Sequence, residues 1–252
     1  MIPLRDDVPS RTIPVVNNAL ITLNVLAFVA ELGMGRGLDS YLRQAAVIPA
    51  LYSGGDGRLA LGEVVTTSLQ PGLGLRVFVS MFLHGGVLHI LGNMLYLWIF
   101  GDNVEDRVGH LRYLVFYLVC GWVATYAHIW ADAGSRIPSI GASGAIAGVL
   151  GAYLVLYPRA RVVTLLPLGF FTQLVHVPAV FFLLFWFLQQ FLYGALSLGA
   201  RTAEAGGVAW WAHIGGFATG LLLVGLFQQR RRRPAGRDDW WTSRASSRRR
   251  RD

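Results

Sequence analysis

Long apolar runs separated by shorter polar stretches dominate the hydropathy pattern of this chain. Each run has about the length that one bilayer-spanning helix needs, ~17 to 25 residues. Six such runs occur, at residues 13–33, 77–101, 111–130, 139–157, 177–198 and 208–228. The pattern predicts an all-α membrane protein in which six transmembrane helices form one bundle.

The connections between these runs indicate a single membrane domain over residues 13–228. The longest one, residues 34–76, combines an apolar piece with a turn-rich Ser-Gly-Gly-Asp-Gly stretch, and we expect it to lie along the membrane surface. The first run resembles a secretory signal, but Asp6 and Asp7 dilute its flanking positive charge. We therefore expect a retained helix behind a short N-terminal segment, residues 1–12.

The composition agrees with a membrane location. Apolar residues make up 54% of the 252 residues and charged residues only 14%, against roughly 25% charged in a soluble domain. A water-soluble globule needs more charge on its surface, and a disordered chain holds fewer apolar residues. The single cysteine, Cys120, excludes an intramolecular disulfide and a cysteine-built metal site.

Nearly all of the net charge of +8 lies in a polar tail, residues 229–252. Its last 23 residues hold ten arginines and three aspartates, which amounts to +7. Arginines beside a membrane helix favour the cytoplasmic side, so the tail predicts a cytoplasmic C-terminus and, with six spans of a cell membrane, a cytoplasmic N-terminus. Such a tail is more typical of a disordered anchor for anionic headgroups than of a nucleic-acid-binding domain.

Two polar residues stand on faces made of small residues. Ser143 lies in the fourth run, and His213 precedes Gly216 and Gly220 on one face of the sixth. One interpretation is packing, because small residues let membrane helices approach closely and a serine there often bonds to its own helix. For His213 the corresponding alternative is a polar group that only bonds a neighbouring helix.

A second interpretation joins the two residues into a catalytic pair. Both helices are predicted to begin on the outer side, with Ser143 and His213 at a similar depth of ~7 to 9 Å. A serine hydroxyl becomes an effective nucleophile when a neutral imidazole at ~2.6 to 3.2 Å accepts its proton. No acidic residue lies at that depth in either helix, so the sequence predicts a Ser-His dyad rather than a triad.

The second run adds further polar side chains. His89 and Asn93 are four residues apart and share a helix face, whereas His84 points about 140° away from His89. Two donors on one face, aimed at a serine, are suited to hold the negative oxygen of a tetrahedral intermediate. A metal site is less favoured, because the histidines are five residues apart and no carboxylate or thiolate joins them in this helix.

Taken together, these motifs resemble the rhomboid family of intramembrane serine proteases. The residues that match its HxxxxHxxxN, GxxxExxxG, GxSG and His-GxxxG patterns are His84, His89, Asn93, Gly101, Glu105, Arg107, Gly109, Gly141, Ser143, Gly144, His213, Gly216 and Gly220. The resemblance covers residues 13–228. It implies a six-helix bundle that cuts single transmembrane segments near the outer face, with no metal and no organic cofactor.

The resemblance also implies roles for individual residues. Ser143 attacks the peptide bond, and His213 serves as base and then as acid. His89, Asn93 and the Ser143 backbone N–H hold the oxyanion, while Glu105 and Arg107 join the second and third helices.

The sequence departs from the family at two positions. Leu75 stands where many members have Trp, and Ala147 stands where some members place an aromatic ring against the histidine. The second departure leaves His213 to be oriented by other contacts.

The sequence leaves two other functional classes open. One is a non-proteolytic relative that binds transmembrane helices without cutting them, which the loss of Ser143 or His213 would indicate. The other is a transporter or channel. Two repeated halves in the sequence would favour this class, and the sequence shows no such repeat.

Overall fold

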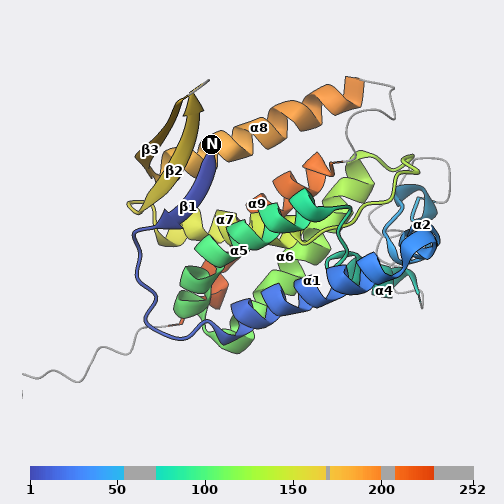
Figure 1. The fold of residues 1–252 in the computed structure, drawn as a ribbon, viewed down its shortest axis with the longest axis horizontal. Coiled ribbons are helices and arrows are strands. Elements are labelled where there is room, and N and C mark those ends of the chain that lie inside the picture. The colour runs from blue at the N-terminus through green and yellow to red at the C-terminus, as the bar shows by residue number, and fades with distance from the viewer. Residues whose placement is uncertain (54–71, 169–170, 200–207, 230–252) are drawn as a thin grey trace, which may run out of the picture.

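The computed structural model describes residues 1–53, 72–168, 171–199 and 208–229, and it is mostly helical (Figure 1). Among the described residues, the longer helices are α1 (Val15–Gly33), α5 (Val87–Val108), α6 (His110–Ala131), α7 (Ser143–Leu156), α8 (Ala179–Gly199) and α9 (Trp210–Phe227). Between α1 and α5 lie the short helices α2 (Leu38–Ala45) and α4 (Leu73–Ser80) and the 3-10 turns Gly35–Gly37 and Pro49–Leu51. Most of the tail 229–252 and part of the connection 34–76 fall outside the described residues.

Four of the long helices, α1, α6, α8 and α9, are long and apolar enough to cross a membrane. Helix α5 is long enough, but it carries polar groups such as Asn93, Asp102 and Glu105. Helix α7 has 14 residues, so at 1.5 Å per residue it is about 21 Å long, which is shorter than the ~30 Å hydrocarbon core. The structure therefore supports a membrane protein with several apolar helices.

The predicted second helix, 77–101, is wrong in its bounds. Helix α4 ends at Ser80, and α5 begins only at Val87 and continues to Val108. The break occurs at Gly85 and Gly86, which are poor helix formers. The buried Glu31 carboxylate compensates for the lost helical bond, since it accepts the His84 backbone N–H at 3.2 Å. His84 therefore lies in the connection before α5 and not on that helix.

The predicted fourth helix, 139–157, begins four residues later than expected. Ser139 exchanges two backbone hydrogen bonds with Val47 at 2.7 and 3.2 Å, so this segment is extended. Gly141 follows with a φ of +125°, which a residue with a side chain rarely adopts. Its N–H donates to the Ser80 carbonyl at 2.8 Å. These contacts place Ser143 at the first residue of α7.

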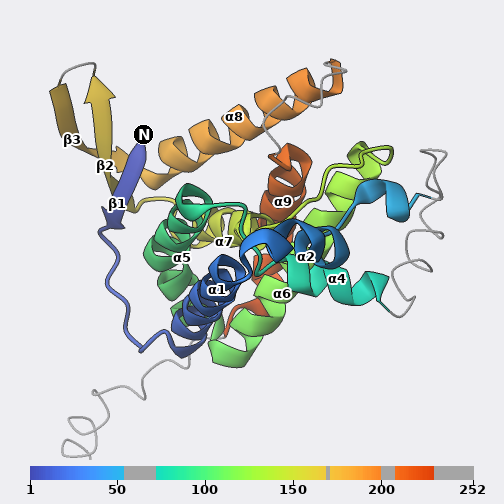
Figure 2. The same ribbon diagram turned by 45° about the vertical axis from the view of Figure 1, so that its right-hand side comes forward.

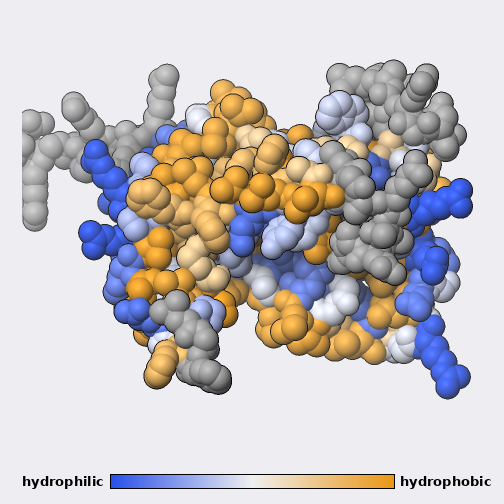
Figure 3. All heavy atoms as spheres, turned by 90° about the horizontal axis from the view of Figure 1, so that it is seen from above, coloured by the Kyte–Doolittle hydropathy of each residue, from blue (hydrophilic) through white to orange (hydrophobic). Residues whose placement is uncertain are grey.

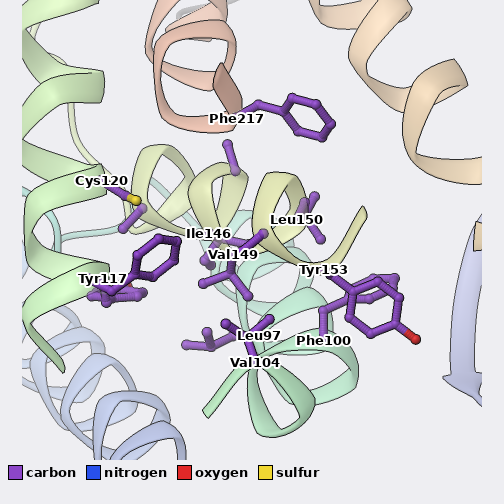
Figure 4. Close-up of a cluster of buried hydrophobic side chains, with 14 of the residues drawn as sticks. Leu97, Phe100, Val104, Tyr117, Cys120, Ile146, Val149, Leu150, Tyr153 and Phe217 are labelled. Atoms are coloured by element: carbon purple, nitrogen blue, oxygen red, sulfur yellow. The ribbon is translucent and has the colours of Figure 1, made fainter. Parts of the chain in front are cut away.

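Helix α7 forms the centre of the bundle. Its residues from Gly144 to Tyr153 are all buried, and Figure 4 shows them between side chains of α5, α6 and α9. Leu97 and Phe100 reach it from α5, and Cys120 reaches it from α6. Because α7 is short and enclosed on several sides, its first turn lies at the bottom of a depression in the bundle.

The residues that resemble GxxxExxxG join three helices. The buried Glu105 carboxylate accepts the backbone N–H groups of Val16 and Asn17 at 3.0 and 2.7 Å, and it also pairs with His110 of α6. It therefore caps the start of α1, where N–H groups lack helical partners. At Gly101 a Cβ atom would lie 2.1 Å from the Asn17 Oδ1 atom, so a side chain there would displace the buried Asn17.

The other two residues of this group lie near the end of α5. Gly109 turns the chain between α5 and α6 with a φ of +85°. The Arg107 guanidinium lies 5.8 Å from the ring centre of Tyr157, just beyond the end of α7. Arg107 thus contacts the chain that follows the fourth long helix.

A three-stranded antiparallel sheet makes the all-α prediction incomplete. Its order is β1 (Ile2–Asp6), β2 (Arg161–Leu168) and β3 (Phe171–Pro178). The sheet lies at the end of the bundle where α1 begins, and β3 leads directly into α8 (Figures 1 and 2). The β-branched residues Val162, Val163 and Thr164 favour a strand in a region that the apolar pattern marked only as a connection.

The N-terminal strand is fixed to the bundle through Asp6. Its carboxylate accepts hydrogen bonds from the Tyr153 hydroxyl and from the Asn103 side-chain amide at 2.8 Å. Burial raises the pKa of this carboxyl to about 6, and the charge of Asp102 adds to the effect. In the unfolded chain an aspartate titrates near ~3.9.

This pKa difference predicts that strand β1 is held more tightly at pH 5 than at pH 8. Between these two pKa values the folded state binds the extra proton, so stability is gained as the pH falls through 6. The measurement is hydrogen exchange of the β1 and β2 amides, corrected for intrinsic rates. Asp6→Asn, which keeps an acceptor oxygen, is expected to abolish the difference, and equal protection of the wild type at both pH values would contradict the prediction.

Candidate active site

Ser143 and His213 meet at the start of their two helices. The Ser143 Oγ atom lies 2.7 Å from the His213 Nε2 atom, which is within hydrogen-bond distance. Ser143 is the first residue of α7, so its backbone N–H lies at the positive end of the helix dipole without a helical partner. The prediction that Ser143 lies ~7 to 9 Å inside its helix is wrong, but the expected pairing of the two side chains is present.

Backbone contact between α7 and α9 makes this distance possible. Cβ atoms at Gly216 and Gly220 would lie 2.0 and 1.8 Å from the carbonyl oxygens of Gly144 and Gly148. A Cβ atom at Gly151 would lie 2.1 Å from the Phe217 carbonyl oxygen. The small-residue faces predicted on these helices are therefore packed against each other, and any larger side chain would separate them.

The second ring nitrogen of His213 has a partner that sequence reasoning missed. The His213 Nδ1 atom lies 2.7 Å from the Gln190 Oε1 atom of α8. An amide oxygen only accepts, so Nδ1 carries the proton and the Nε2 lone pair faces the Ser143 hydroxyl. The Trp186 ring, also from α8, lies 5.9 Å from the imidazole centre. Gln190 and Trp186 thus supply the contacts that Ala147 does not.

His89 approaches Ser143 from α5. The Gly85 backbone N–H donates to the His89 Nδ1 atom at 3.4 Å, which leaves the proton on Nε2. A Cβ atom at Gly141 would lie 2.9 Å from His89 Nε2 and 3.6 Å from Ser143 Oγ. Gly141 therefore separates the two side chains by little more than its own backbone, and the His89 N–H faces the space above the serine.

Asn93 provides a second donor on the same helix face. Its side chain is 8% exposed, and within the described part of the chain its Nδ2 atom has no hydrogen-bond partner. A buried amide without a partner carries a free-energy penalty that a bound acceptor would remove. The atom is thus available to a ligand in the cavity that Asn93 lines.

His84 does not line the cavity, but it packs against His89 from behind. Its ring is 1% exposed and packs edge-on against His89 with 5.1 Å between ring centres. Its backbone is held by Glu31, as described above. The contact between Glu31 of the first helix and His84 could not be predicted from sequence patterns, because the two residues are 53 positions apart.

One cavity of about 700 Å³ is lined by the polar side chains of His89, Asn93, Ser143, Gln190 and His213. Its other walls are largely apolar and come from α5, α7, α8 and the start of α9, with Leu88, Ile146 and Trp186 among them. Seen from above, the surface is hollowed where hydrophilic residues lie between hydrophobic ones (Figure 3). Behind Ser143 a second cavity of about 20 Å³, bordered by Ser80, Thr125 and Ser139, has room for about one water molecule.

Comparison with protein families decides the relationship. A family model described as the Rhomboid domain matches residues 72–230, more than half of the chain. The chain belongs to the rhomboid family. This family includes serine intramembrane proteases, and the matched region contains Ser143, His213, His89 and Asn93.

Several rhomboid proteins are similar to parts of the chain. RHOMBOID-like protein 4 of Arabidopsis thaliana is 34% identical over 157 residues, which cover 60% of this chain and 33% of that protein. Rhomboid protease GluP of Bacillus subtilis is 38% identical over 96 residues, 38% of this chain and 18% of GluP. Presenilin-associated rhomboid-like protein A, mitochondrial, of Danio rerio is 35% identical over 96 residues, 37% of this chain and 25% of the relative. This rhomboid chain thus aligns with a third or less of each of these relatives.

Proposed function

We propose that this rhomboid protein is an intramembrane serine endopeptidase that hydrolyses peptide bonds in or next to transmembrane segments of other membrane proteins. The observation that carries the proposal is the 2.7 Å contact between Ser143 Oγ and His213 Nε2 inside a cavity that His89 and Asn93 also line. A hydroxyl, a base and two donors around one space are the groups that acyl transfer needs.

The geometry supports a two-step reaction. His213 Nε2 takes the Ser143 proton as the oxygen attacks the substrate carbonyl carbon, and the same proton then passes to the leaving amine nitrogen as the peptide bond breaks. Water then attacks the resulting ester as His213 takes one of its protons, and the ester bond breaks as His213 returns that proton to Ser143 Oγ, which releases the second product and restores the serine. His89, Asn93 and the Ser143 backbone N–H hold the negative oxygen in both steps.

The placement in the membrane is part of the proposal. Helices α1, α5, α6, α7, α8 and α9 alternate in direction (Figure 1). The start of α1 and the end of α9 therefore lie at one end of the bundle, and Ser143, the first residue of α7, lies toward the other. We infer six spans of a cell membrane with cytoplasmic termini. The Arg-rich tail 229–252 would bind anionic headgroups. The short helix α7 leaves Ser143 below the outer surface, where water reaches it through the cavity.

The substrate would enter from the lipid. Helix α8 lines the cavity with Trp186 and Gln190, and its outer side exposes large apolar side chains such as Phe185, Leu188 and Leu192. A transmembrane segment that unwinds near the outer face would present an extended peptide bond to Ser143. No metal or organic cofactor is needed in this mechanism.

The decisive experiment combines cleavage with active-site labelling. Purified protein in liposomes is incubated with a labelled single-span substrate that contains helix-breaking residues, and a fluorophosphonate probe is applied in parallel. We expect product and a probe adduct that peptide mapping assigns to Ser143. Binding of the substrate with neither product nor adduct would contradict the proposal and favour a non-proteolytic protein that binds transmembrane helices.

Asn93→Ala is expected to lower kcat about 100-fold, because removal of one oxyanion donor typically costs ~10²- to 10³-fold. KM should change little, since the donor acts on charge that appears only in the transition state. Steady-state cleavage kinetics measure both values. Gln189→Ala, in a residue of α8 that does not line the cavity, is the control, and a wild-type kcat for Asn93→Ala would remove this residue from the oxyanion site.

A further inference from the structure

The imidazole of His213 is held from both sides. Ser143 faces Nε2, and Gln190 of α8 faces Nδ1. We propose that Gln190 is a positioning residue that fixes the orientation and tautomer of His213, and that it does so only while α8 is docked against α9. This inference rests on the proposed function, because it assigns a partner to the proposed base.

Gln190 is an unusual residue at its position. The 21 residues of α8 contain no charged side chain and are otherwise largely apolar. Gln190 is 7% exposed and His213 is 8% exposed, so their contact is largely shielded from solvent. A buried amide in such a helix is costly unless it is hydrogen-bonded. Its bond to the imidazole removes this cost and at the same time determines which nitrogen of His213 is free.

A neutral amide suits this place better than a carboxylate. In soluble serine proteases an aspartate orients the base and stabilises its cation. A charge in the middle of an apolar helix facing lipid would be expensive. Gln190 gives the orienting acceptor without the charge, and the Trp186 ring adds a cation-stabilising face at 5.9 Å from the imidazole centre.

The hydrogen bond to Gln190 also makes the orientation of His213 depend on the position of α8. Helix α8 rests on α9 through Phe187 against Phe217 and Tyr193 against Trp210, with ring centres 4.8 and 5.0 Å apart. Its other side is exposed, and it diverges from α5 along its length (Figure 2). Outward movement of α8 near Gln190 would break the 2.7 Å bond. His213 would then be free to rotate and lose its alignment with Ser143.

The test uses three variants that separate positioning from packing. Gln190→Met keeps the side-chain size and removes the acceptor, whereas Gln190→Glu keeps an acceptor oxygen. We expect Gln190→Met to lower kcat about 10- to 100-fold with less than a twofold change in KM, and Gln190→Glu to retain most of the wild-type kcat. Gln189→Met, the same change one residue away and about 100° around the helix, is the matched control with wild-type kinetics.

The stability of the two Gln190 variants is expected to rank in the opposite order to their activity. An apolar Met in α8 should raise the unfolding temperature or leave it unchanged, while a buried Glu should lower it. Activity that followed stability, with Gln190→Met as good as the wild type and Gln190→Glu poor, would overturn the inference.

A second readout does not need protease activity. Ring-¹⁵N-labelled histidine NMR, with His213→Gln to assign the signal, should show the Nδ1-protonated tautomer in the wild type and a mixture in Gln190→Met. An unchanged His213 signal in Gln190→Met would refute the positioning role. If the tautomer shifts while the wild type neither cleaves nor binds the fluorophosphonate, the positioning role stands and the protease function fails.

Discussion

Replacing Ser143 with alanine is expected to reduce cleavage at least ~10⁴-fold, because the nucleophilic oxygen is lost while the backbone donors remain. The fold should persist, since Ser143 is partly exposed to the cavity and alanine is a good helix former. Cleavage of a labelled transmembrane substrate measures the rate, and the thermal unfolding midpoint in detergent measures the fold.

His213→Ala should give a loss of similar size, and Ser143→Ala with His213→Ala together should be no worse than either alone. The two side chains act as one unit through their 2.7 Å contact, so their effects do not add. Ser197→Ala in α8 and His176→Ala in β3 lie away from the cavity lining and are the controls. Additive losses in the double variant would argue against a Ser-His dyad.

Gly220→Ala is expected to destabilise the protein by about 2 kcal/mol or more and to abolish most cleavage. Its Cβ atom would lie 1.8 Å from the Gly148 carbonyl oxygen, and a backbone atom cannot rotate away as a side chain can. The helices must therefore separate, at the typical overpacking cost of ~1 to 3 kcal/mol. The separation would lengthen the distance from Ser143 to His213.

Gly225→Ala is the matched control on the same helix. A Cβ atom there meets nothing within 4 Å, so the change should leave cleavage unaltered and keep or slightly raise stability through helix propensity. Thermal unfolding and cleavage assays on both variants make the comparison. Equal behaviour of the two glycine variants would show that close backbone approach does not hold the dyad together.

Much of the site could be predicted from the sequence because its signals are local. The spacing of His213, Gly216 and Gly220 identifies one helix face, and the matching small-residue face beginning at Ser143 identifies its partner. The four-residue spacing of His89 and Asn93 likewise places both residues on one face of α5. Each of these signals depends only on helical periodicity, which the chain satisfies wherever the helices form.

The missed features depend on contacts between distant segments. The start of α7 is set by pairing of Ser139 with Val47, and the break before α5 is stabilised by Glu31. Hydropathy does not detect either contact. The sheet was missed because β1 and β2 are about 155 residues apart and neither has a strong alternating pattern. Gln190 was missed because a lone amide in an apolar helix does not show which partner it meets.

Helices α7 and α9 touch backbone to backbone at three contacts, those of Gly216 with Gly144, Gly220 with Gly148 and Gly151 with Phe217. We therefore expect the two helices to respond to bilayer thickness or lateral pressure as one rigid body, with Ser143 and His213 moving together. His89 and Asn93 are carried by α5, and Gln190 is carried by α8, so these groups shift relative to that body. We expect lipid composition to tune the rate of the proposed reaction through His89, Asn93 and Gln190, while Ser143 stays in contact with His213.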